Sequence, residues 1–277
     1  MILGLSVIDD DPADPYQWVA DLVGAANVRQ RRVGPNPISA TGRLSTSKAP
    51  EAQQYESLLE RDFVTLLDAD RRVEQFATQP ISIPWKGPRG RTRRYTPDVI
   101  VRYTAQALAA EPGLKHTVFE VKPSAIIRRK WAELKPQWLA ARAFCRRHGL
   151  AFRIINEARL DAPYLKNLRF LRRYRRQFMD EHTELVGERQ WALLRALYDL
   201  GTSTPAGLLA KVTADRALQA ELLPWLWQLV NLGRIGVDLT KPLTMASPIW
   251  TLEDRRSMGL DPDPHATWRP AAKPRWS

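Results

Sequence analysis

A strand–helix–strand pattern in the middle of the chain constrains the fold more than any other feature. The apolar segment Thr117–Val121 is closed by Pro123, and apolar and basic residues then alternate at helical spacing over Ala125–His148, where Pro136 predicts a kink. A short β-branched run, Ala151–Ile155, follows as a buried strand. Because a crossover through a helix joins parallel strands, we expect an α/β fold with a mixed sheet flanked by helices.

Two further β-like segments and one helix are expected ahead of this unit. Gln79–Pro84 and Pro97–Tyr103 have strand character and are separated by the turn-rich run WKGPRGRTRR, so the three strands read as a meander. From Glu51 to Asp68 apolar residues recur at three- and four-residue steps, which predicts an amphipathic helix.

Three charged residues stand out on the predicted strands. Asp98 opens the apolar run YTPDVIV, and Glu120 and Lys122 lie two apart in VFEVKP, so that alternation points both to one face. If the two strands are neighbours, Asp98 and Glu120 converge on one divalent cation. Hard carboxylate oxygens suit Mg²⁺, for which Mn²⁺ can substitute. A divalent cation beside a lysine indicates phosphodiester hydrolysis as the reaction. The alternative is that these residues form a charged pair on an exposed strand face, which is common.

A glutamate on the preceding helix completes the acidic cluster. Glu56 and Glu60 are one helical turn apart and compete for this role. We prefer Glu60, because it lies deeper in the apolar stripe, beside Leu59 and Phe63.

The chain resembles the TnsA endonuclease subunit of heteromeric transposases. The resemblance runs through YESLLERDFVTLLDADRRVEQFATQPISI, RRYTPDVIV, FEVKP and AFRII, and covers about residues 29 to 175. It implies a nuclease core like that of type II restriction enzymes, with an acidic triad and a lysine at Glu60, Asp98, Glu120 and Lys122. It also implies cleavage at the 5′ ends of a transposon, with a TnsB-like DDE transposase acting on the 3′ ends and a TnsC-like ATPase as regulator.

Charge and composition fit a partner that is a polyanion. The 42 basic against 30 acidic residues give a net charge of +12 and a pI near 10.1, which favours nucleic acid over an acidic membrane surface. The lone Cys145 excludes an internal disulfide, and neither a signal peptide nor a membrane span is recognisable, so we expect a cytoplasmic protein. The four histidines lack metal-ligand spacing, so no zinc site is proposed.

Two basic groups flank the predicted site and are candidates for DNA phosphate contacts. One is the loop before Asp98, and the other begins the helix after Lys122; solvated surface positions are the alternative for both. The first group contains Lys86, Arg89, Arg91, Arg93 and Arg94, and the second contains Arg128, Arg129 and Lys130. A third basic run, KNLRFLRRYRR, is expected on a helix that leads out of the first domain.

The C-terminal third predicts a winged helix-turn-helix domain. Helices are expected over Glu188–Leu200, from Pro205 to about Val212 and over Arg216–Leu232, followed by two β-like pieces around Lys241–Pro242. The third helix is too apolar for base reading, which favours packing or protein docking. The expected domains are an irregular segment at 1–50, a catalytic domain at 51–182, the winged helix at 183–252 and a flexible tail at 253–277.

Two other functions remain open at the level of sequence. A stand-alone restriction or repair nuclease of the same fold would cut DNA without partners, and the lack of base-reading residues weakens that hypothesis. A DNA-binding assembly protein with an inactive nuclease fold is the other, and the complete set of three acidic residues and a lysine speaks against it.

Overall fold

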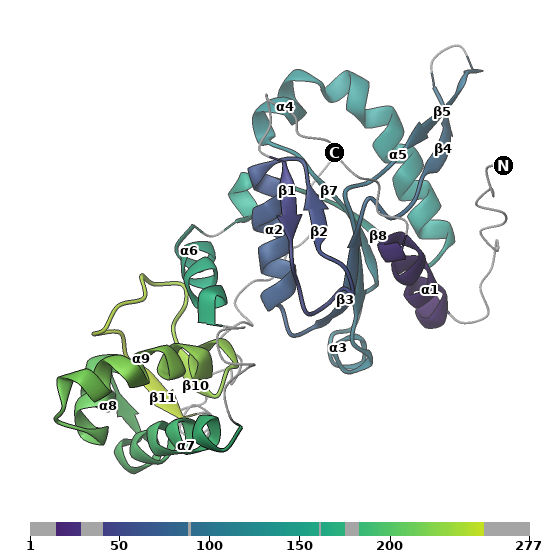
Figure 1. The fold of residues 1–277 in the computed structure, drawn as a ribbon. Helices are drawn as coiled ribbons and strands as arrows, with labels where there is room; N and C mark the ends of the chain where they lie inside the picture. Colours follow the sequence, from purple (N-terminus) through teal and green to yellow (C-terminus); the bar gives the residue numbers. More distant parts are fainter. Residues whose placement is uncertain (1–14, 29–40, 88–89, 161, 175–182, 252–277) are drawn as a thin grey trace. The chain divides into compact units, whose positions relative to one another are not determined.

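The computed structural model describes residues 15–28, 41–87, 90–160, 162–174 and 183–251, and the chain divides into two compact units (Figure 1). The first unit is Met1–Leu160 and the second is Asp161–Ser277. The division thus falls after Leu160, earlier than the expected boundary between 182 and 183. The expected tail at 253–277 lies outside the described residues, as does much of the segment 1–50. Among the described residues, no helix has both the length and the apolarity needed to cross a lipid bilayer.

A four-stranded mixed sheet forms the centre of the first unit. Its order is β3-β6-β7-β8, with antiparallel pairing between β3 and β6 and between β6 and β7, and parallel pairing between β7 and β8. These strands are β3 (Val73–Thr78), β6 (Val99–Tyr103), β7 (Thr117–Val121) and β8 (Ala151–Ile155). The mixed sheet and its parallel pair are therefore as expected from the strand–helix–strand pattern.

The expected meander is wrong in its first strand. The partner of β6 on that side is β3, and the segment around Ile83 instead forms β4 (Ile83–Lys86), which pairs with β5 (Thr92–Tyr95) in a separate hairpin. A register shift between Val73 and Gln75 interrupts the alternation of β3, so its two-residue period is weak in the sequence.

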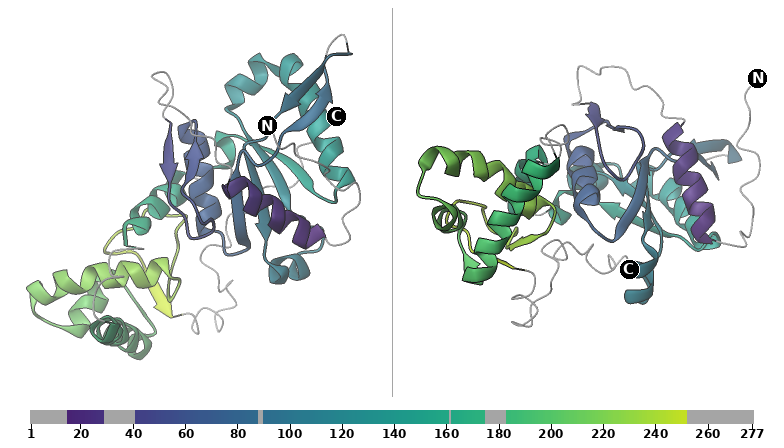
Figure 2. Two further views of the ribbon diagram at one scale, coloured as in Figure 1. Left: turned by 45° about the vertical axis from the view of Figure 1, so that its right-hand side comes forward. Right: turned by 60° about the horizontal axis from the view of Figure 1, so that its bottom comes forward.

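Helices cover both faces of the sheet (Figures 1 and 2). On one face α1 (Pro15–Val28) and α5 (Trp131–Arg147) meet the sheet in a buried apolar cluster. On the other face lies α2 (Leu58–Ala69), whose Phe63 ring is 5.0 Å from the ring of Phe119 in β7. Phe119 and its neighbour Val118 thus point to opposite faces, as strand alternation requires.

The helix α2 is shorter than expected and begins at a capping box. Ser57 is its N-cap, and the expected first turns from Glu51 onward are occupied by β2 (Gln53–Tyr55), which pairs with β1 (Gly42–Leu44). Glu56 therefore precedes the helix and does not lie on it, which corrects the expectation that Glu56 and Glu60 share one helix.

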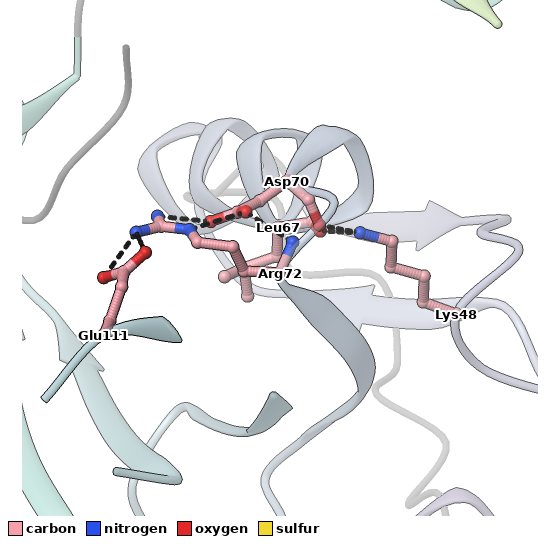
Figure 3. Close-up of polar contacts among 5 residues, drawn as sticks. All are labelled: Lys48, Leu67, Asp70, Arg72 and Glu111. Carbon is pink, nitrogen blue, oxygen red and sulfur yellow. Dashed lines mark hydrogen bonds and ion pairs between the residues drawn. The ribbon is translucent and has the colours of Figure 1, made fainter. Parts of the chain in front are cut away.

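The C-terminal end of α2 is held by charged side chains (Figure 3). Lys48 Nζ donates to the carbonyl oxygens of Leu67, at 2.9 Å, and of Asp70. Arg72 donates to both carboxylate oxygens of Asp70 and pairs with Glu111 at 3.2 Å. A lysine at the last carbonyls of a helix satisfies acceptors that have no partner within the helix. These contacts fix the helix that carries Glu60.

The predicted long helix after β7 is divided in two. It forms α4 (Ser124–Arg129) and α5, and the interruption lies at Lys130, ahead of Pro136, which is inside α5. Gly149 follows α5 with a positive φ of 69°, the left-handed conformation that ends helices. The short elements of the first unit are α3 (Ala105–Ala110) and the 3₁₀ turn η2 (Glu157–Arg159).

The second unit contains four α-helices and a small sheet in its described part. The helices are α6 (Ala162–Leu171), α7 (Thr183–Leu200), α8 (Pro205–Val212) and α9 (Arg216–Asn231), and the 3₁₀ turn η3 (Arg172–Tyr174) follows α6. The three-stranded sheet has the order β10-β11-β9, with β9 (Thr202–Ser203), β10 (Ile235–Val237) and β11 (Ile249–Thr251).

The last three helices lie close to their expected positions. Thr204 caps α8 by accepting from the Gly207 N–H at 3.0 Å, and Asp215 caps α9. Trp225 and Trp227 of α9 are buried, as expected for core residues.

The helix α6 belongs to the second unit because Asn167 anchors it there. The buried Asn167 amide donates to the carbonyls of Leu239 and Lys241 at 2.8 and 2.7 Å and accepts from the Leu243 N–H at 3.2 Å. These contacts join residues more than seventy positions apart in the sequence. The local pattern of the basic run KNLRFLRRYRR therefore could not predict this packing.

Candidate active site

The pairing of β6 with β7 brings Asp98 beside the end of β7. Val99 is opposite Phe119 in the register, and Asp98, directly before β6, donates its N–H to the Phe119 carbonyl at 3.1 Å. The Asp98 carboxylate in turn accepts from the Val121 N–H at 2.6 Å through Oδ2. Asp98 is thus fixed to β7 through both its backbone and its side chain, on either side of Glu120.

Glu120 and Lys122 form an ion pair at the same place. Lys122 Nζ lies 3.1 Å from Glu120 Oε1, and the carboxylate side chain is only 3% exposed, against 29% for the lysine. The second oxygen, Oε2, accepts a hydrogen bond of 2.6 Å from the hydroxyl of Tyr95. The expectation that the two strands are neighbours and that Glu120 and Lys122 share a face agrees with these contacts.

Electrostatic interactions join all four residues expected at the site. Burial raises the pKa of Asp98 well above its ordinary value, the Glu120 carboxylate and Glu60 raise it further, and Lys122 opposes both. Burial works against the charge of Lys122, yet Glu120 and Asp98 raise its pKa above the ordinary lysine value. Two carboxylates and one ammonium are therefore crowded into a poorly solvated space.

Glu60 reaches this group electrostatically, but its carboxylate is engaged elsewhere. Its Oε2 accepts from the Glu56 N–H at 2.7 Å and its Oε1 from the Ser57 hydroxyl at 2.9 Å, while Ser57 Oγ accepts from the Glu60 N–H at 3.2 Å. This is a reciprocal capping box. Burial raises the pKa of Glu60, these hydrogen bonds lower it, and Lys122 also lowers it.

The two carboxylates that the strands bring together are suitable ligands for a hard divalent cation. Asp98 and Glu120 offer carboxylate oxygens, and within the described residues Asp98 Oδ1 takes no hydrogen bond. A cation would also offset the repulsion that raises the Asp98 pKa. Across the described part of the chain, however, no three His, Cys, Asp or Glu side chains form a ready-made metal cage. The Glu60 carboxylate is the third candidate donor, and both of its oxygens already accept hydrogen bonds within the capping box.

Gln79 forms hydrogen bonds with both Asp98 and Glu56. Its N–H donates to the Asp98 carbonyl at 2.8 Å, and its side-chain amide donates to Glu56 Oε1 at 2.7 Å. It has a φ of 49°, the left-handed conformation that costs energy for residues other than glycine. The strained backbone of Gln79 is thus stabilised by its hydrogen bonds to Glu56 and Asp98.

The basic residues expected near the site are exposed on two neighbouring elements of the first unit. The β4–β5 hairpin and α4 share one buried apolar cluster, to which the hairpin contributes Ile83, Trp85 and Tyr95 and α4 contributes Ile127. Arg93 stacks its guanidinium 5.9 Å from the Trp85 ring centroid. The exposed basic residues are Lys86, Arg91, Arg93 and Arg94 on the hairpin, and Arg128, Arg129 and Lys130 at the end of α4. Arg89 lies outside the described residues.

The sequence interpretation missed Tyr95, Ser57 and Gln79. The sequence signal for Ser57 is the pattern Ser-x-x-Glu before an apolar run, which marks a capping box. Tyr95 is the single buried residue of β5 and follows three exposed ones. An aromatic residue after a polar run was the only sequence feature that marked it. Nothing in the sequence pattern marks Gln79.

Comparison with known proteins places part of the chain in a described family. Residues 70–157 match the model of a family described as TnsA-like endonuclease N terminal. The matched stretch contains Asp98, Glu120 and Lys122, and Glu60 precedes it. The resemblance inferred from the sequence motifs is confirmed over this stretch, and it supports a TnsA-like endonuclease. A search of curated proteins found no match.

Proposed function

We propose that this chain, with its TnsA-like endonuclease stretch at residues 70–157, is a transposon endonuclease. It hydrolyses a DNA phosphodiester at the 5′ ends of the element, depends on Mg²⁺, and acts with a DDE transposase and an ATPase regulator. The observation that carries the proposal is the convergence of Asp98, Glu120 and Lys122 on one poorly solvated site inside the matched stretch.

The carboxylates are the groups that would hold the metal. Asp98 and Glu120 would supply carboxylate oxygens from the strands, and Glu60 would supply a further one from α2. A bound divalent cation supplies positive charge against the scissile phosphate and lowers the pKa of an attacking water. Burial of Glu120 excludes bulk water from this side of the site, which strengthens each electrostatic contact there.

Lys122 acts as a charged hydrogen-bond donor. Its pKa is raised by Glu120 and Asp98, so the ammonium keeps its proton at neutral pH. We therefore assign it the role of orienting the attacking water or a phosphate oxygen, rather than the role of a base that accepts a proton.

The exposed basic residues hold the DNA backbone. Arg91, Arg93 and Arg94 on the hairpin and Arg128, Arg129 and Lys130 at the end of α4 contact phosphates and place the scissile bond, without reading bases. In the second unit α7, α8 and α9 and the strands β9, β10 and β11 follow the order of a winged helix-turn-helix, and we assign this part to DNA contact or docking of the ATPase.

The test is a reconstituted reaction with transposase, ATPase, transposon-end DNA and Mg²⁺. We expect Asp98→Ala to abolish 5′-strand nicking and to leave 3′-strand joining by the transposase intact. The matched control is Asp62→Ala, which removes a half-buried aspartate of α2 that pairs with Arg61 outside the site. Equal 5′ nicking by wild type and Asp98→Ala would refute the proposal. Cleavage by wild type without partners would indicate the stand-alone nuclease instead.

A further inference from the structure

Tyr95 makes a short hydrogen bond to a side chain of the candidate site. Its hydroxyl donates to Glu120 Oε2 at 2.6 Å, and both side chains are buried, with 6% of Tyr95 and 3% of Glu120 exposed. A hydrogen bond to a carboxylate in such a place is charge-assisted and well shielded from water. Neither the family match nor the expected acidic set assigns a role to this tyrosine.

The aromatic ring of Tyr95 is locked by apolar packing. It belongs to a cluster with Ile83 and Trp85 of the hairpin and Trp138 of α5, and its ring meets that of Phe152 edge-on at 6.5 Å. Because the ring cannot rotate away without opening this cluster, the hydroxyl is delivered to Glu120 at a fixed position.

The two oxygens of Glu120 are consequently divided between two partners. Oε2 faces the Tyr95 hydroxyl and Oε1 faces Lys122 Nζ at 3.1 Å. Without the tyrosine hydroxyl, the carboxylate is free to turn about its last torsion, which is a soft one.

We propose that Tyr95 is a positioning residue that holds Oε2 of Glu120 and thereby presents Oε1 toward Lys122 and a divalent cation. This inference rests on the proposed function, since it assumes that Glu120 is a metal ligand. Groups that orient a metal ligand typically contribute about 10- to 100-fold to metal affinity.

Tyr95 is next in the chain to two of the exposed arginines of the hairpin. Tyr95 ends β5 directly after Arg93 and Arg94, and it pairs with Ile83 at the base of the hairpin.

The experiment measures Mn²⁺ binding to the full chain by calorimetry, independently of cleavage. We expect Tyr95→Phe to weaken Mn²⁺ binding about 10- to 100-fold. In the reconstituted reaction it should raise the Mg²⁺ concentration for half-maximal nicking without changing the DNA concentration needed.

The matched control is Tyr103→Phe. Tyr103 is also buried, at 1% exposed on β6, and its hydroxyl interacts with Thr117 rather than with a carboxylate of the site. We expect this variant to bind Mn²⁺ as wild type does. A general effect of losing a buried hydroxyl would appear in both variants, and that result would overturn the positioning role.

A second measurement does not need the substitution. Wild-type chain with 3-fluorotyrosine at position 95 should show a ¹⁹F shift on Mg²⁺ addition, whereas the same label at position 103 should not. If Mn²⁺ binds wild type and Tyr95→Phe equally, or if the label at 95 does not move, the inference is wrong while the proposed function stands. If wild type neither binds Mn²⁺ nor nicks DNA, both are wrong.

Discussion

The candidate site has a strand half and a helix half, and the two differ in what holds their carboxylates. The strand half consists of Asp98, Glu120 and Lys122, which are fixed by β7 and by one another. In the helix half, Glu60 is bonded to its own N-terminal turn. The strand half is therefore held in place by the sheet, whereas the Glu60 carboxylate of the helix half also caps its own helix.

The largest effect is expected from the strand half. Lys122→Met keeps much of the length of the side chain but removes the charge, so we expect the 5′-nicking rate to fall about 10²- to 10³-fold, as for loss of one transition-state donor. Single-turnover nicking in the reconstituted reaction measures this. Lys115→Met, an exposed lysine ahead of β7, is the control and should nick at the wild-type rate.

An intermediate effect is expected from the helix half. Glu60→Gln retains the capping box, because glutamine also caps at this position, but it removes the negative charge. We expect nicking to fall about 10- to 100-fold, as for the loss of one group that supports a metal, with little change in melting temperature.

Ser57→Ala tests the capping of α2 separately from the proposed role of Glu60 in metal binding. It removes the N-cap side chain and should cost about 1 kcal/mol of stability, as lost caps do, while nicking persists. If Glu60→Gln nicks as wild type does, Glu60 serves the helix alone and the metal set is limited to the strand half.

The smallest effect concerns the stability of the metal-free protein. Burial and the neighbouring Glu120 raise the pKa of Asp98, so its charge opposes folding near neutral pH. Asp98→Asn should raise the free energy of unfolding in EDTA, because the amide carries no charge for burial and the neighbouring Glu120 to disfavour. Urea unfolding in EDTA measures it, and a lower stability than wild type would mean that Asp98 carries no electrostatic cost.

Much of the fold was predictable because its elements have strong local patterns. The parallel pairing of β7 with β8 follows from the strand–helix–strand order, and α8 and α9 lie close to their predicted ranges because caps and glycines mark them. The expectation failed at β3, where a bulge obscures the alternation, and at the start of α2, where Glu51–Tyr55 share apolar spacing with the helix but pair as β2.

The sequence by itself determined which residue types are available for chemistry and on which kind of element each lies. The two-residue period of a strand was enough to predict that Glu120 and Lys122 share a face. The tertiary structure alone decided that Asp98 is bonded beside them, that Tyr95 fixes Glu120, and that Glu60 is turned into its capping box. The physical reason is that local periodicity sets the direction of a side chain, whereas its partner depends on which distant segments pack against it.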